Sequence, residues 1–269
     1  MSRTLLVAIV AGAVILDAPL EVGAVVFTTV ALLARYLAVA NTTPNVNTRG
    51  RNLTVASDDT LYVQPDAFGD YPSVQAAVDA APKDGTERIL YLAAGTYDEA
   101  VIVPSGTRNL FIKGITGDAS DVILTGDRAH GMTNPATGQP YGTEGSAVLT
   151  VKAPGATVAN LTVQNTFDPA NHPEVDAYST QAVALAAEGD RQTFSQCRLI
   201  ARQDTVLCKA PVATGQYRQY FVGCYVEGAI DFIFGNATAV FDECNIALKN
   251  WAGAPCSHRT PTRATSTAS

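Results

Sequence analysis

A threefold repeat of the pattern Phe-x-x-Cys constrains this chain more than any other feature of its sequence. The pattern begins at Phe194, Phe221 and Phe241, at intervals of 27 and 20 residues. A repeat of this period is typical of a solenoid, in which successive coils of the chain stack on one another. In a parallel β-solenoid, equivalent residues of neighbouring coils lie one strand spacing apart, about 4.8 Å.

The same register predicts two facing carboxylates. Asp204 follows Cys197 by seven residues, and Asp231 follows Cys224 by seven. Two carboxylates one coil apart repel each other, so the pKa of one is raised and the other remains ionised. An acid beside a carboxylate nucleophile suits acyl or glycosyl transfer. The alternative is that each Asp only forms a turn, and we prefer it for Asp168, which stands in the same frame.

Amide and aromatic side chains accompany the carboxylates. Gln203 precedes Asp204 in the sequence, and Gln181 opens the coil before it. Amide groups in such positions could donate hydrogen bonds to a developing oxyanion. Phe232 and Phe234 stand just after the second carboxylate and could form an apolar wall that stacks on a sugar ring.

Short runs of β-forming residues, separated by Gly, Pro, Asn and Asp, fill the chain from residue 89 onward and predict an all-β fold. Residues 70–82 have helical spacing instead, with Pro72 at the start and Pro82 at the end. One amphipathic helix before many strands suits a cap on the open end of a solenoid. A helical bundle is excluded, and an immunoglobulin-like sandwich does not explain a repeated frame with irregular insertions. We expect a parallel β-helix with a short N-terminal capping helix.

The first forty residues predict a targeting segment. Residues 4–16 and 22–34 are uncharged apolar runs, and each is shorter than the roughly 20 residues that cross a bilayer. Ala38-Val39-Ala40 resembles a signal cleavage site. We expect a signal peptide or an uncleaved membrane anchor in residues 1–40, and a misassigned start is the third reading. A linker in 41–56, the β-helix domain in 57–250 and an unstructured tail in 251–269 follow.

Charge and cysteine content exclude several functions. The net charge is −7, the pI is about 4.9 and the basic residues are scattered, which argues against a nucleic-acid partner. The cysteines form no C-x-x-C pair and the three histidines are far apart, so we expect no metal site. No G-x-S-x-G motif is present, which argues against a Ser-His-Asp hydrolase.

Four motifs carry a resemblance to a known family. In order, they are Gly95-x-Tyr97-x-Glu99, Gln181-Ala-Val-Ala-Leu185, Gln203-Asp204-Thr205 and Asp231-Phe-Ile-Phe-Gly235. Together they resemble the motif set of the carbohydrate-esterase pectin methylesterases (pectinesterases), over about residues 58–250. The resemblance implies a right-handed, single-stranded parallel β-helix. It also implies removal of methyl esters from the galacturonate units of pectin, without a metal or an organic cofactor.

The resemblance assigns a role to each polar residue. Asp231 would be the nucleophile that attacks the ester carbonyl, releasing methanol and forming an acyl-enzyme. Asp204 would be the general acid that protonates methanol and later activates water. Gln181 would stabilise the tetrahedral oxyanion, and Gln203 would help to hold the intermediate.

The resemblance also names substrate contacts and a disulfide. Phe234 matches an aromatic residue that lines the sugar groove. Ser146 and Val148 lie in a stretch that resembles a substrate-contacting segment, with Val148 where a Thr is expected. Cys224 and Cys244 would pair as a disulfide.

One family motif has no match here. It is a Gly-Arg-Pro-Trp-like segment beyond the second carboxylate, whose Arg pairs with the nucleophile and whose Trp lines the groove. Trp251 stands in a different context, and Arg259 and Arg263 lie in the Ser- and Thr-rich tail. We therefore expect the last coils to be missing, as in a truncated or frame-shifted product, and the activity to be impaired by the missing arginine.

Three functions remain open from the sequence. The first is a secreted, monomeric pectin methylesterase that touches a membrane only if its N-terminal segment is uncleaved. The second is a non-catalytic β-helix that binds pectin. The third is a β-helical polysaccharide lyase or hydrolase, for which the sequence supplies neither the acidic cluster nor the nearby base.

Overall fold

The computed structural model describes residues 60–64, 70–212 and 214–249, and the backbone of four short strands elsewhere. The chain divides into two units, Met1–Asn47 and Thr48–Ser269. In the first unit, β1 (Ala8–Val10) pairs with β2 (Ala13–Ile15) in antiparallel orientation. Apart from these strands, the predicted signal segment and linker lie outside the described residues, and so does most of the predicted tail.

None of the helices in the described part of the chain is long and apolar enough to cross a membrane.

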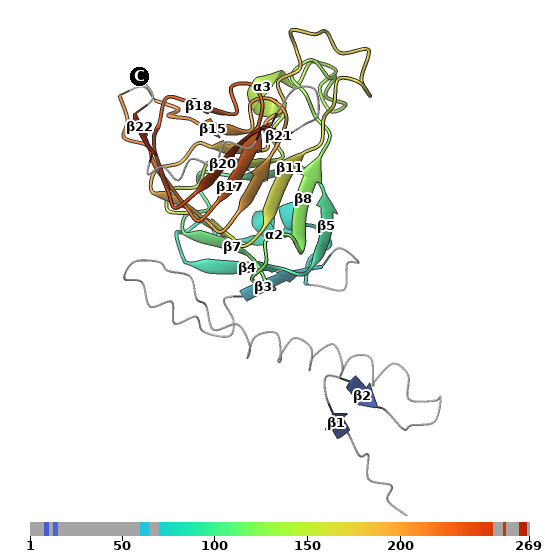
Figure 1. Cartoon of the computed structure of the whole chain (residues 1–269). Coiled ribbons are helices and arrows are strands. Elements are labelled where there is room, and N and C mark those ends of the chain that lie inside the picture. The colour runs from blue at the N-terminus through green and yellow to red at the C-terminus, as the bar shows by residue number, and fades with distance from the viewer. Residues whose placement is uncertain are drawn as a thin grey trace, which may run out of the picture. The chain divides into compact units, whose positions relative to one another are not determined.

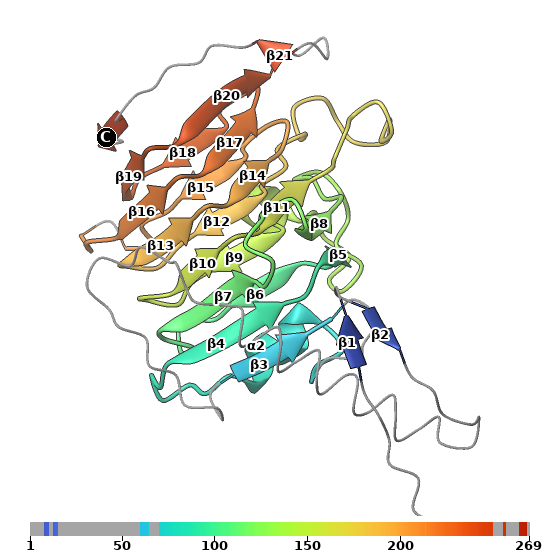
Figure 2. The ribbon, with the colours of Figure 1, turned by 60° about the horizontal axis from the view of Figure 1, so that its bottom comes forward.

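The second unit is built from three parallel sheets that run along a common axis, as Figures 1 and 2 show. The first sheet has the order β22-β19-β16-β13-β10-β7-β4-β3, the second β21-β20-β17-β14-β11-β8-β5, and the third β18-β15-β12-β9-β6. The pairs from β3 to β20 are all parallel, and only β21 and β22 pair in antiparallel orientation. The predicted parallel β-helix is confirmed.

Each complete coil gives one strand to each sheet. The strands, coil by coil, are β4 (Arg88–Leu92), β5 (Gly95–Asp98) and β6 (Val101–Val103); β7 (Leu110–Gly114), β8 (Val122–Gly126) and β9 (Leu149–Val151); β10 (Thr157–Ala159), β11 (Thr162–Asn165) and β12 (Leu185–Ala187); β13 (Gln192–Ser195), β14 (Arg198–Ile200) and β15 (Val206–Cys208); β16 (Arg218–Val222), β17 (Tyr225–Gly228) and β18 (Ile233–Gly235). Outside these five coils stand β3 (Thr60–Val63), β19 (Thr238–Asp242), β20 (Asn245–Lys249), β21 (Pro255–Cys256) and β22 (Ala264–Thr267).

A single residue in the left-handed backbone region turns the chain from the first sheet into the second. These corner residues are Asn160, Gln196, Gly223 and Glu243, with φ between 52° and 60°. Only Gly adopts this conformation freely, and Asn and Asp tolerate it better than other residues. These corners fix the register of the coils, because the strands before and after the corner pair at equivalent positions in each coil.

The Phe-x-x-Cys repeat fills the interior. Phe194, Phe221 and Phe241 are in register in β13, β16 and β19, with ring centroids 4.7 and 4.4 Å apart and nearly parallel rings. All three are at most 2% exposed. Such a stack buries several hundred Å² of apolar surface and holds consecutive coils together. The repeat is therefore the core of the solenoid, as its spacing predicted.

The disulfide predicted between Cys224 and Cys244 is not formed, and both thiols are free. Cys224 Sγ donates instead to the carbonyl of Phe194 (3.4 Å), and Cys244 Sγ to that of Phe221 (3.5 Å). The thiols act as small buried apolar groups.

The helix α2 (Val74–Ala80) covers the first coil, as the sequence predicted. It begins after Ser73, whose Oγ accepts a hydrogen bond from the amide of Ala76, so Pro72 lies outside the helix. The Glu99 carboxylate accepts bonds from the amides of Val74 (2.8 Å) and Gln75 (3.0 Å). Glu99 thus caps the helix, because the first amides of a helix have no partner within it.

Two long loops leave the solenoid where the second sheet passes into the third. Residues 127–148 follow β8 and contain α3 (Gly142–Gly145), and residues 166–184 follow β11. They share a small core of Ala129, Phe167, Val175 and Ala182. Backbone bonds join them, from His130 to Gln181 (2.8 Å) and from Gly131 to Ser179 (2.9 Å). The loops therefore form one packed body beside the later corners.

Candidate functional site

Asp204 and Asp231 occupy the same corner of consecutive coils. A parallel bridge pairs Gln203 with Ile230, and the amide of Asp204 donates to the carbonyl of Ile230 (3.0 Å). Both carboxylates stand just before the third-sheet strands β15 and β18, in the left-handed region with φ of 61° and 45°. The corners between the first and second sheets also have a positive φ. The left-handed backbone of Asp204 and Asp231 is therefore a property of the solenoid, and it is not evidence for catalysis. The predicted register of the two carboxylates is confirmed.

The two carboxylates differ in environment. The side chain of Asp204 is buried, with the residue 6% exposed, whereas Asp231 is exposed. Burial, and then the charge of Asp231, raise the pKa of Asp204 from 3.8 to about 6. Desolvation disfavours the charged form of a carboxyl group, and a neighbouring negative charge adds to this effect. One group of the pair can therefore carry a proton near neutral pH beside an accessible carboxylate.

Gln203 precedes Asp204 in the chain, and its side-chain amide opposes part of the rise in the pKa of Asp204. Its backbone carbonyl accepts a bond from the amide of Ala182 (3.3 Å), so the loop 166–184 holds it in place. Both Gln203 and Asp204 are thus fixed by the coils before and after them.

Gln181 is partly buried at the end of the same loop. Its Nε2 donates to the carbonyl of Tyr178 (3.1 Å), and its Oε1 is buried without a hydrogen-bond partner among the described residues. A buried polar atom without a partner is rare in folded proteins. The second N–H of Nε2 is left for a ligand. Such a donor is what an oxyanion needs.

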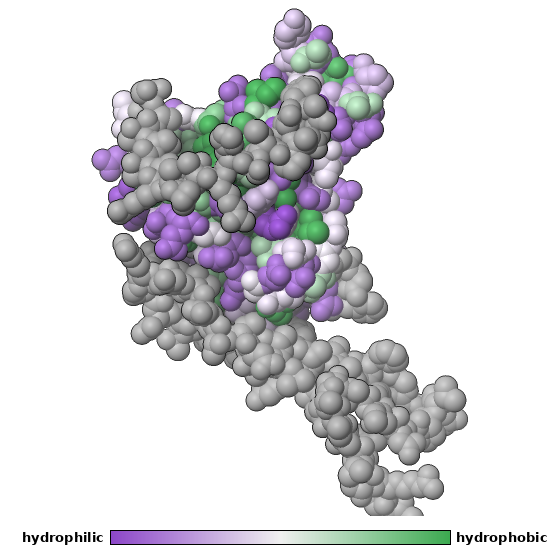
Figure 3. Space-filling model, viewed as in Figure 1, coloured by the Kyte–Doolittle hydropathy of each residue, from purple (hydrophilic) through white to green (hydrophobic). Residues whose placement is uncertain are grey.

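The two phenylalanines after Asp231 pack against different hydrophobic clusters. Phe234 pairs with Leu207 of β15 and packs on the outer face, against a cluster that includes Val183 and Ala186. Apolar surface gathers over β15, β18 and α3 in the space-filling view (Figure 3). Phe232 is partly buried and packs against the interior core, and its place in an apolar wall that stacks on a sugar stays a prediction.

Ser146 and Val148 do not reach the surface, and their predicted substrate contacts are wrong. Both are 0% exposed. Ser146 Oγ donates to the carbonyl of Thr143 (2.7 Å) and accepts from the amide of Val183 (3.1 Å), so it joins the two long loops. Val148 belongs to the interior core. A Val at this position is explained by burial.

Asp168 takes the turn role that the sequence favoured. Its Oδ1 accepts a bond from the amide of Ala170 (3.1 Å) and pairs with the guanidinium of Arg202. Arg202 stands two residues before Asp204 but turns toward the loop 166–184. Of the ion pairs formed within residues 60–249, none involves Asp204 or Asp231.

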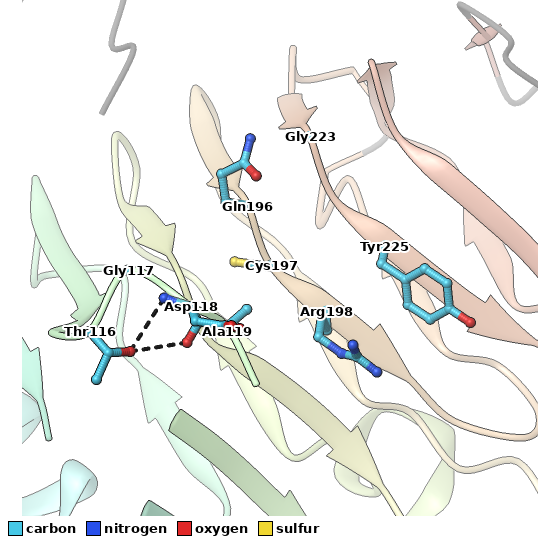
Figure 4. A pocket seen from close by; sticks show the side chains of 9 residues that line it. All are labelled: Thr116, Gly117, Asp118, Ala119, Gln196, Cys197, Arg198, Gly223 and Tyr225. Carbon is cyan, nitrogen blue, oxygen red and sulfur yellow. Dashed lines mark hydrogen bonds between the residues drawn. The ribbon is translucent and has the colours of Figure 1, made fainter. Parts of the chain in front are cut away.

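A hollow of about 480 Å³ lies on a different face of the solenoid (Figure 4). It is lined by the turn after β7, the corner residues Gln196 and Gly223, and the side chains of Arg198 and Tyr225. Arg198 lies over the Tyr225 ring, 5.2 Å from its centroid. Asp118 is the only acidic residue that lines this hollow, so Asp204 and Asp231 are the better candidate site.

The fold and the carboxylate pair define a parallel β-helix protein with two interacting acids at one corner. The sequence profile of the pectinesterase family matches residues 59–262. The chain belongs to the pectinesterase family, which confirms the resemblance carried by the four motifs.

Individual relatives agree with this placement. Pectinesterase 3 of Citrus sinensis is 35% identical over 204 residues, which cover 75% of this chain and 31% of that protein. The pectin methylesterase PemA from Erwinia chrysanthemi is 29% identical, with a TM-score of 0.61 over 71% of this chain and 56% of that one. A pectin methylesterase solved with a hexasaccharide is 28% identical, with a TM-score of 0.62, over 74% and 57%.

The chain spans about a third of the length of the curated relatives that it matches, between 28% and 38% for three of them.

Proposed function

We propose that this protein hydrolyses the methyl esters of pectin. Its family and the buried Asp204, whose pKa is raised, in register with the exposed Asp231 support the proposal. The observation that carries it is the split between the two acids, because ester hydrolysis through an acyl-enzyme needs a carboxylate nucleophile and a separate proton donor.

The proposed reaction has two halves. The Asp231 carboxylate attacks the ester carbonyl, and a new C–O bond forms while the negative charge moves to the carbonyl oxygen. The tetrahedral intermediate collapses, the bond to the methoxy oxygen breaks, and Asp204 gives its proton to this oxygen, so that methanol leaves and Asp204 becomes ionised. Ionised Asp204 then takes a proton from water, whose oxygen attacks the acyl carbon and frees Asp231 and a galacturonate carboxylate.

The remaining site residues have supporting roles. The spare N–H of Gln181 would donate to the oxyanion, which is where negative charge develops. Gln203 would stabilise the ionised form of Asp204. Phe234, on the outer face, would contact the sugar.

A non-catalytic pectin-binding role is the second candidate. Among the residues that the structure describes, no lysine, arginine or histidine forms an ion pair with Asp231. A polysaccharide lyase is the third candidate, and it would form an unsaturated product in place of methanol.

One assay separates these functions. The protein is incubated with highly esterified pectin and with fully de-esterified polygalacturonate, while methanol and ultraviolet absorbance are followed. We expect methanol from the esterified polymer alone. Unsaturated, ultraviolet-absorbing product would identify a lyase. Binding without turnover that is unchanged by Asp231→Asn would identify a binding module.

We further propose that the protein acts outside the cell as a monomer. The two apolar runs at its N-terminus support export, and pectin is a polymer that cannot pass through a membrane. N-terminal sequencing of the protein recovered from the culture medium, beginning near residue 41, would support a cleaved signal. Recovery with the membrane fraction would support an anchor.

A further inference from the structure

The hollow on the second sheet is lined by an arginine whose hydrogen-bond donors are unused. Its volume of about 480 Å³ is within the usual range of small-molecule sites. Arg198 of β14 pairs in the sheet with Tyr225 of β17, and both side chains line the hollow together with the turn of residues 116–119 (Figure 4). The proposed ester hydrolysis does not use this face of the solenoid.

Tyr225 holds the guanidinium of Arg198 in place. The guanidinium carbon lies 5.2 Å from the centroid of the Tyr225 ring, close enough for a cation–π attraction. The Tyr225 hydroxyl donates to the Glu227 carboxylate (2.6 Å), which also accepts a bond from Nζ of Lys249 (2.7 Å). The ring that supports Arg198 is therefore anchored at its far end.

The donors of this guanidinium are not spent inside the protein. Within the part of the chain that the structure describes, Arg198 forms no side-chain hydrogen bond and no ion pair, whereas Arg202 and Arg218 are paired with carboxylates. A guanidinium carries five N–H groups in a planar fork that matches the two oxygens of a carboxylate. A fixed arginine with a free edge is thus suited to bind a carboxylate from solution.

The other wall of the hollow is also fixed. Thr162, which is 3% exposed, donates from Oγ1 to the carbonyl of Ala119 (2.7 Å) and so ties the turn of residues 116–119 to the second sheet. At the corner, a Cβ on Gly223 would come within 2.1 Å of Nε2 of Gln196, so the glycine leaves the space that this amide occupies. The exposed Gln196 amide offers both a donor and an acceptor to a ligand.

The charges around Arg198 leave its edge open to a ligand. Asp118 faces it from the turn and Glu227 from the next coil. Glu227 is paired with Lys249, and Oδ1 of Asp118 accepts bonds from the amide (2.8 Å) and the hydroxyl (2.7 Å) of Ser120. Neither carboxylate bonds to Arg198. Recognition therefore depends on the fork of the guanidinium and not on a large positive field.

We propose that this hollow is a second binding site for the polysaccharide, in which Arg198 binds the free carboxylate of a galacturonate unit and Gln196 bonds to its hydroxyls. The proposed ester hydrolysis creates this carboxylate, so the identity of the ligand rests on the proposed function. The site takes the product of the reaction, and highly esterified pectin offers it few carboxylates.

The test uses two probes that differ only in charge. A linear trimer of galacturonate, and the same trimer with each carboxyl methyl-esterified, are titrated into the ¹⁵N-labelled full-length chain carrying Asp231→Asn, which preserves the ester. The amides of Gly117, Gln196 and Gly223 line the hollow and report binding there by their NMR shifts. We expect saturable shifts with the acid and binding of the ester that is weaker by about tenfold or more, because methylation removes the charge.

The variants remove the guanidinium or move the loss elsewhere. Arg198→Met should weaken binding of the acid by about tenfold or more, the size of a charge-assisted hydrogen bond. Arg128→Met is the matched control, because Arg128 also lies over a tyrosine ring (Tyr141, 5.0 Å) but does not line the hollow. It should bind the acid at the hollow like the parent. Arg198→Lys, which keeps the charge without the fork, replaces Arg198→Met if the spectrum of that variant shows that it is unfolded.

Three results would overturn the inference. They are the absence of shifts at the hollow, equal affinities there for the acid and the ester, and unchanged binding in the folded Arg198 variant. Methanol release by the parent protein tests the proposed function separately. Binding of the acid at the hollow without methanol release would refute the ester hydrolysis alone, and methanol release without shifts at the hollow would refute the second site alone.

Discussion

Asp204 is an acid held where ionisation is unfavourable, and this has a consequence for stability. Because its pKa is raised to about 6 in the folded protein, against 3.8 as an ordinary value, the folded state binds more protons between these two pH values. The free energy of unfolding therefore falls as pH rises from about 4 to about 6.

Asp204→Asn removes this cost because an amide does not ionise. We expect the variant to be more stable than the parent at pH 8 by about 2 to 3 kcal/mol, and the difference to vanish below about pH 4. Urea unfolding at the two pH values measures it. Asp118→Asn is the control with the opposite sign, because hydrogen bonds from Ser120 lower the pKa of Asp118. A destabilised Asp204→Asn at pH 8 would refute this account of the burial.

For single residues, the sequence predicted the place of a side chain in the solenoid better than its burial. The register of Asp204 and Asp231 followed from the spacing of the repeat, because one coil contributes one residue to each equivalent position. The burial of Ser146 and Val148 depends on how two loops pack, which no local pattern encodes. No sequence pattern pointed to the hydrogen bond between Thr180 and Gln203, because these residues are close only in the folded chain.

Among the elements, α2 depends on a residue from another coil. The Glu99 carboxylate accepts two amide bonds at the start of this helix, where negative charge is also favoured by the helix dipole. We expect Glu99→Ala to reduce the free energy of unfolding by about 1 to 2 kcal/mol. Glu99→Gln should cost less, since one oxygen remains.

The matched control is Asp121→Ala, an exposed residue on a neighbouring turn whose backbone carbonyl and amide both form hydrogen bonds, which the substitution leaves in place. Chemical denaturation should show little change for this variant. Equal effects of Glu99→Ala and Asp121→Ala would show that Glu99 does not cap the helix. The sequence predicted the helix from its spacing but not this cap, because the two segments meet only through the coil.

The two long loops are joined by a histidine. His172 bonds to Asp127 (2.9 Å), at the base of the first loop, and to Glu174 (3.1 Å), and its ring stacks on Phe167. The hydrogen bond to Asp127, followed by that to Glu174, raises the pKa of His172 despite its partial burial. Its charged form therefore stabilises the loops below pH 6.5, and this contribution is lost as pH rises through the raised pKa.

Hydrogen exchange at the amides of His130 and Gly131, which bond to the second loop, measures this contact. After correction for the intrinsic rate, we expect their protection to fall between pH 6 and pH 9. His172→Gln should lack the pH dependence, and amides of the central strands should show none in either protein. Protection that is independent of pH in the parent would contradict the proposed role of the charge.

For the whole molecule, the sequence was sufficient for the architecture. The Phe-x-x-Cys frame predicted the stack of coils, since a solenoid repeats its core residues at each turn and each coil contacts only its neighbours. The joint packing of residues 127–148 with 166–184 could not be predicted, because these segments interrupt the repeat and meet through non-local contacts. The carboxylates lie where the regular coils meet this packed body.

Methanol release from esterified pectin by the parent protein and by Asp231→Asn is the most direct test of the proposed reaction. Asp118→Asn, on a distant turn, is the control, and circular dichroism verifies the fold of each protein. We expect the parent and Asp118→Asn to release methanol at equal rates and Asp231→Asn to be slower by about a thousandfold or more. Release by Asp231→Asn at the parent rate, or none from the folded parent, would contradict the assignment of the carboxylate pair.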